Sequence, residues 1–172
     1  MIRIFNLTFL VFLFLITKAN SLIEIDITRG NLDPLPIAVS PLFQDDNSKK
    51  NSISELKVEN VGSEISSVVE NNLKTSGLFN PLSKEAFLQK PDIAHLKPRF
   101  EDWALIKAQA LITGKVTIEN KKLKVEFRLW DILAGREMMA LAFTTVPSNW
   151  RRVGHIISDK VYERLTGEKG YF

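Results

Sequence analysis

The pattern of apolar and polar positions begins with a strand-like alternation in Leu22–Arg29. Ile23, Ile25 and Ile27 fall on one face and polar residues on the other, as in a half-buried strand. The next seven residues contain glycine, asparagine, aspartate and two prolines, which interrupt the alternation. A second strand is expected at Ile37–Phe43, with the proline near its end confined to an edge or a bulge.

The middle of the chain changes from a two-residue to a helical period. Gln44–Ser54 is polar and rich in turn residues, and it predicts a surface loop. A helix is expected between Val61 and Ser76, capped by Asn60 and ended by Gly77. Its apolar stripe consists of Val61, Ile65, Val68, Val69 and Leu73. A short extended piece at 79–82, an irregular stretch at 87–98 and a short helix at 101–108 are expected to follow.

The clearest strand signal is a three-strand antiparallel meander. Its expected strands are Ala110–Ile118, Leu123–Asp131 and Glu137–Val146, because each alternates and turn residues separate them. Trp130 points away from the apolar face of the second strand, onto the face that carries Arg128. Either a helix or a neighbouring domain covers this tryptophan, or it marks a contact site.

The last helix has a narrow apolar stripe and a glycine stop. The stripe consists of Trp150, Val153, Ile157, Val161 and Leu165. Gly167 follows the stripe, where a left-handed cap suits glycine. His155 is expected on a solvated face, with Arg151 and Asp159 one turn away on either side. Tyr171 and Phe172 are expected to form an exposed stub.

These elements together predict an α/β fold. The order is strand, strand, helix, short strand, helix, three-strand meander and helix. Such an order is typical of a two-layer domain with helices packed on a mixed sheet that ends in an antiparallel meander. At 172 residues the chain is long enough for one such domain, expected at 22–172, plus an N-terminal leader.

The first 21 residues resemble a secretory signal. A short positive start precedes the apolar run Ile4–Ile16, and Ala19 and Ser21 place small residues where signal peptidase reads them. Cleavage is expected between Ser21 and Leu22, which predicts export to the periplasm. The alternative is an uncleaved membrane anchor, but thirteen helical residues span only about 20 Å of a hydrocarbon core of roughly 30 Å.

Composition excludes several function classes. Without Arg3 and Lys18 of the leader, 21 basic residues face 20 acidic ones, and no basic cluster suggests nucleic-acid binding. The chain has no cysteine, and its two histidines are far apart in sequence, so neither a thiol nucleophile nor a metal site is expected. Isolated glycines give no phosphate-binding loop. No catalytic, cofactor-binding, metal-binding or small-molecule-binding residue is predicted, and the chain is not expected to be an enzyme.

Five ordered segments resemble the N-terminal domain of the TolB family. They are Asp33–Val39, Leu73–Leu82, Leu111–Val116, Phe127–Asp131 and the run from Trp150 to Phe172. The resemblance implies a non-enzymatic periplasmic protein of the Tol–Pal system, which links inner-membrane TolA to outer-membrane constriction during cell division, maintains envelope integrity and is exploited by some imported colicins. Family members continue into a β-propeller that binds Pal. No such sequence is present, so the chain is expected to be a fragment, a frameshifted copy or an isolated domain, without Pal binding.

The resemblance also implies a partner-binding segment. In the family, the first residues of the exported protein dock on the C-terminal domain of TolA, and here they correspond to residues 22–33. The residues expected to contact TolA are Leu22, Ile23, Glu24, Ile25, Asp26, Ile27, Thr28 and Arg29. An alternating strand at a free terminus can add to another sheet's edge. Alternatively, the segment completes the domain's own sheet, or the whole chain is a membrane-anchored adaptor or ligand-binding module with an uncleaved signal.

Overall fold

A computed structural model describes the protein at Ile23 and over residues 33–172. In chain order the elements are β1 (Leu35–Val39), β2 (Phe43–Gln44), α2 (Asp46–Leu56), α3 (Val61–Thr75), β3 (Phe79–Pro81), the 3-10 helix η1 (Lys84–Ala86), α4 (Pro91–Ala94), α5 (Phe100–Leu105), β4 (Ala110–Glu119), β5 (Lys122–Asp131), β6 (Arg136–Thr145), the 3-10 helix η2 (Pro147–Asn149) and α6 (Trp150–Thr166).

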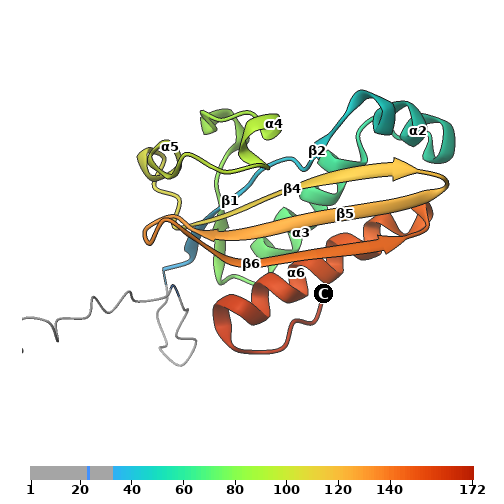
Figure 1. Ribbon diagram of the computed structural model, residues 1–172. Coiled ribbons are helices and arrows are strands. Elements are labelled where there is room, and N and C mark those ends of the chain that lie inside the picture. The colour runs from blue at the N-terminus through green and yellow to red at the C-terminus, as the bar shows by residue number, and fades with distance from the viewer. Residues whose placement is uncertain (1–22, 24–32) are drawn as a thin grey trace, which may run out of the picture.

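Over these residues the strands form one mixed six-stranded sheet in the order β3-β1-β4-β5-β6, with β2 also paired to β4. β1 pairs in parallel with β3 and β4, whereas β4, β5 and β6 form the expected antiparallel meander. Figure 1 shows the three long meander strands side by side, with α6 running along them. The predicted fold class, a two-layer α/β domain with helices on a mixed sheet, is confirmed.

The strand expected over residues 37–43 divides at Pro41. β1 pairs with the start of β4, and β2 pairs with the same strand farther along, at Phe43 and Lys115. Ser66 of α3 bridges the gap, because its hydroxyl accepts the N–H of Leu42 at 3.0 Å and donates to the carbonyl of Ser40 at 3.1 Å. One buried hydroxyl therefore replaces the ladder bonds that are lost beside the proline.

The prediction of a surface loop at 44–54 was wrong, because α2 occupies this stretch. Asp45 caps the helix by accepting the N–H of Ser48 at 2.8 Å, a bond that lowers the pKa of the Asp45 carboxyl. Ser48 accepts the N–H of Ile118 at 3.2 Å, and Asn51 donates to the carbonyl of the same residue at 2.7 Å. The helix thus binds β4 through polar groups, which apolar periodicity does not reveal.

Helices α3 and α6 agree with the sequence pattern and pack against one face of the sheet. Asn60 caps α3 by accepting the N–H of Ser63 at 3.0 Å. Gly167 ends α6 at a φ of 76°, as expected. Most stripe residues of both helices are buried with the sheet in one core, whereas Val68 and Trp150 are only partly buried.

A second, smaller core lies on the other face of the sheet. Trp103 of α5 and Trp130 of β5 are its large members. Trp130 is 7% exposed, its indole N–H donates to the Thr113 hydroxyl at 2.8 Å, and the Phe100 ring of α5 meets it edge-on with centroids 5.9 Å apart. The sequence left several alternatives open for Trp130, and the structure shows that a helix, α5, covers it. The stretch expected to be irregular contains one short helix, α4.

Two expectations about the C-terminal region were wrong. His155 is partly buried rather than solvated, and its Nδ1 lies 2.9 Å from the amide of Asn72 on α3. Phe172 is not part of an exposed stub, because its N–H donates to Asp159 at 2.9 Å and its ring contacts that of Tyr162 edge-on. Only Tyr171 is largely exposed, at 67%. Both corrections arise because neighbouring segments fold against α6.

Candidate functional site

Most of the predicted partner-binding residues lie outside the part of the chain that the structure describes. These are Leu22, Glu24, Ile25, Asp26, Ile27, Thr28 and Arg29, together with Ser21 of the predicted cleavage site. Ile23 is described, and it packs against the main core. Its N–H points to the Asp131 carboxylate at 3.4 Å.

Asp131 holds this contact in place at the end of β5. It is buried, and its other carboxylate oxygen accepts the N–H of Ala134 at 2.9 Å, which shapes the turn into β6. The chain is described again from the exposed Asp33, just before β1. The register pairs Ile37 with Ala110 and Ala110 with Asp131. Ile23 and the start of β1 therefore both lie near one end of the sheet.

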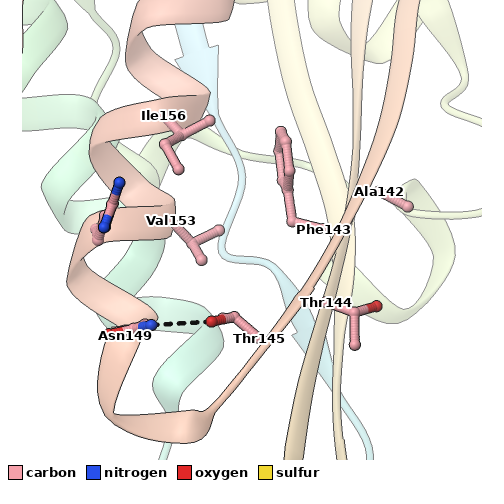
Figure 2. A pocket seen from close by; sticks show the side chains of 8 residues that line it. Ala142, Phe143, Thr144, Thr145, Asn149, Val153 and Ile156 are labelled. Carbon is pink, nitrogen blue, oxygen red and sulfur yellow. Dashed lines mark hydrogen bonds between the residues drawn. The ribbon is translucent and has the colours of Figure 1, made fainter.

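The second surface feature is a pair of separate hollows between β6 and α6, which together we call the β6–α6 groove. Figure 2 shows one end of it, a hollow of about 390 Å³, with Phe143 and Val153 facing each other across it. Asn149 closes this end by donating to the Thr145 hydroxyl at 2.9 Å. The lining residues are Ala142, Phe143, Thr144, Thr145, Asn149, Arg152, Val153 and Ile156.

The groove has a second hollow, of about 330 Å³, at the other end of α6. It is lined by Met139, Lys160, Glu163, Arg164 and Gly167. Arg164 reaches the carbonyl of Met138 at 3.5 Å, and Lys160 pairs with Glu163 at 2.8 Å. That hydrogen bond raises the pKa of Lys160 and lowers the pKa of Glu163, so both groups stay charged at neutral pH.

Sequence reasoning did not identify this groove. The apolar residues Met139, Leu141 and Phe143 alternate as in any half-buried strand, and the sequence predicted only a third antiparallel strand at Glu137–Val146. Only the strand order shows that β6 lies at an edge of the sheet that the described residues form. The one feature of the sequence that could have indicated an edge strand is the run from Met138 to Thr145. It contains no charged residue of the kind that protects an edge.

The two histidines lie apart, in structural settings. The His95 ring stacks on Phe43 with centroids 4.6 Å apart, and its Nδ1 lies 3.0 Å from the carbonyl of Pro91. His155 contacts Asn72. In the residues searched, Ile23 and 33–172, no three metal-binding side chains cluster and no helix is long and apolar enough to cross a membrane.

Comparison with known proteins identifies proteins that are similar to this chain in sequence and in fold. A protein from Pelagibacter ubique, described as Tol-Pal system protein TolB, is 74% identical over 164 residues, which cover 95% of this chain and 37% of the relative. The chain thus spans a little over a third of the relative's length. A crystal structure of TolB from Acinetobacter baumannii matches 80% of this chain and 30% of its own with a TM-score of 0.61 at 22% identity, which shows that the fold is shared.

The model of the TolB amino-terminal domain family matches residues 23–138, from the N-terminal segment to the start of β6. This match and the 74% identical relative agree with the resemblance of five segments noted in the sequence. The chain therefore belongs to the TolB amino-terminal domain family.

Proposed function

We propose that this chain acts as a non-enzymatic adaptor domain in a Tol–Pal cell-envelope system. It is exported to the periplasm, where residues 22–33 dock on the C-terminal domain of TolA. Through this contact it links the inner membrane to outer-membrane constriction during division and helps to maintain envelope integrity. Membership of the TolB amino-terminal domain family and the 74% identical Tol–Pal relative support this role.

The observation that carries the proposal is the alternating Leu22–Arg29 sequence, which precedes the folded domain. Ile23 contacts Asp131, and the chain returns at Asp33 near the same end of the sheet. An extended segment with Ile25 and Ile27 on one face can supply main-chain hydrogen bonds to a sheet edge and apolar side chains to its pockets.

The proposal is tested by calorimetric titration of the TolA C-terminal domain with three proteins: the exported chain, its Ile25→Pro variant and its Glu24→Ala variant. Ile25→Pro should weaken binding strongly, because proline removes a ladder donor and restricts the preceding residue. Glu24→Ala changes the opposite face and should matter less. Thermal unfolding of each variant checks that the domain is intact.

Equal affinity of the Ile25→Pro variant and the unaltered chain would place the TolA contact elsewhere. A variant without residues 22–33 extends the test, since it should lose TolA binding and keep its fold. If the chain stays in the membrane fraction with its leader attached, the alternative of a membrane-anchored adaptor is favoured instead.

A further inference from the structure

The outer edge of β6 offers an uncovered strand. Within the described residues β6 pairs only with β5, so half of its main-chain N–H and C=O groups point away from the sheet. None of its ten residues is buried, and Leu141 near its centre is 37% exposed. Natural edges are usually protected by charge or proline, yet Met138–Thr145 contains neither. The unpaired main-chain groups of this edge can therefore form hydrogen bonds with another strand.

The β6–α6 groove supplies side-chain pockets along this edge. Met139, Leu141 and Phe143 lie on the face of β6 that looks toward α6, because they pair with the core residues of β5. One hollow lies beside Phe143 and Ile156, and the other lies beside Met139. A strand added to β6 would place every second side chain over these hollows.

The rim of the groove is basic. Arg152, Lys160 and Arg164 line it, and Glu163 is the one carboxylate among the residues that line the two hollows. Glu163 already pairs with Lys160 at 2.8 Å. Among the residues described, no carboxylate lies within 4 Å of the guanidinium of Arg152 or Arg164. The rim therefore favours an acidic occupant.

We propose that the β6–α6 groove is a docking site for an extended segment of a partner protein whose α6-facing side chains, at every second residue, include both apolar and acidic ones. The segment adds to the free edge of β6 through main-chain hydrogen bonds. Its apolar side chains fill the two hollows and its carboxylates face Arg152 and Arg164, so both kinds occupy the positions that point toward α6. This contact goes beyond the proposed docking of residues 22–33 on TolA, because it uses the other end of the domain's chain.

Charge argues against a second copy of the chain as the occupant. α6 runs antiparallel beside β6, since Asn149 bonds to Thr145 and Arg164 reaches Met138. An antiparallel β6–β6 pair centred near Leu141 would bring Arg152 of one copy, beside Thr145, toward Arg164 of the other, beside Met138. Such a contact would place like charges together at both ends of the interface.

The probe is a capped ten-residue peptide in which isoleucine and glutamate take turns at every second position, with threonine at the positions between them, compared with the same peptide carrying lysine in place of glutamate. The acidic peptide should bind the purified chain, and binding should weaken as salt rises. Hydrogen exchange should slow at amides of β6, because the added strand pairs with them. The lysine peptide should bind much less tightly.

Two neighbouring arginines provide a matched pair of variants. Arg152→Glu reverses a charge on the rim and should weaken binding of the acidic peptide about tenfold. Arg151→Glu makes the same change at an exposed residue that lies over the Trp150 ring and does not line the groove. It should leave the affinity unchanged. Leu141→Lys introduces a protecting charge at the centre of the edge and should abolish binding.

Three results would overturn the proposal. Equal binding of acidic and lysine peptides, or equal effects of Arg151→Glu and Arg152→Glu, would remove the charge argument. A concentration-dependent dimer that Leu141→Lys disrupts would assign the groove to a second copy. If the peptide binds only after residues 22–33 are deleted, the chain's own segment fills the groove. Titrating TolA with the same variants distinguishes failure of this proposal from failure of the proposed function. Leu141→Lys leaves residues 22–33 intact, so it should abolish peptide binding and leave TolA binding in place.

Discussion

Ile157 of α6 is 1% exposed and lies in the main core, facing the sheet. Truncating it to alanine should lower the free energy of unfolding by about 2–5 kcal/mol, since it removes buried methyl groups and leaves a cavity. Ile156→Ala, one position earlier and only partly buried, is the control and should cost less. Urea unfolding measures both. A loss below about 0.5 kcal/mol for Ile157→Ala, within the range of surface substitutions, would contradict this packing.

Single polar side chains also determine local structure. Ser66 replaces ladder bonds at Pro41, and Thr113 accepts the indole N–H of Trp130. Both hydroxyls are buried, and each satisfies a group whose burial without a partner would cost free energy. Sequence reasoning identified neither, because a serine or threonine shows no period that would indicate its distant partner.

At the scale of elements, the contact between α3 and α6 depends on Gly154. A β-carbon at this position would lie 2.8 Å from Val68 Cγ1 and 2.9 Å from Val68 Cβ, closer than atoms pack. Gly154→Ala should therefore destabilise the domain by about 1–3 kcal/mol through overpacking, although alanine is the better helix former. The cost should shrink in a Val68→Gly background, because the opposing atoms are gone.

A double-mutant cycle on these two residues, measured by thermal or urea unfolding, gives the coupling directly. Additive effects would show that the helices are not in tight contact at this point. Val68 was expected in the buried stripe of α3, and the structure places it partly exposed beside Gly154. A glycine in the interior of α6 is thus explained by the partner helix and not by α6 itself.

At the scale of the whole molecule, export should yield a protein that begins at Leu22. The prediction rests on the short apolar run Ile4–Ile16, which is followed by small residues at Ala19 and Ser21. Intact mass measured on periplasmic material tests the prediction, with Ala19→Leu as a variant that should slow processing. A species that retains residues 1–21 and stays with carbonate-washed membranes would support the anchored alternative.

The two proposed contact surfaces lie close to each other in the molecule. Ile23 contacts Asp131, which pairs with Arg136, the first residue of β6. Ile23 therefore lies near the start of β6, which within the described residues pairs only with β5. One domain could in this way hold two polypeptides at once, one on its N-terminal segment and one along β6.

The sequence by itself determined the elements whose side chains follow a period. The meander, α3 and α6 each have a continuous apolar face, and burial of that face stabilises them whatever lies opposite. The cap residues Asn60 and Gly167 are local features and were also predictable. Together with the five resembling segments, these elements were enough to predict the two-layer fold and its family.

Only the tertiary structure decided which surfaces remain open. α2 escaped prediction because its polar side chains bond to Ile118 of a distant strand. The free edge of β6 follows from strand order, and strand order depends on long-range pairing that no local pattern specifies. The basic rim arises because α6 is brought beside β6, which joins Arg152 and Arg164 to apolar residues such as Phe143. A contact surface of this kind exists only when separate segments meet, so the chain's periodicity could not reveal it.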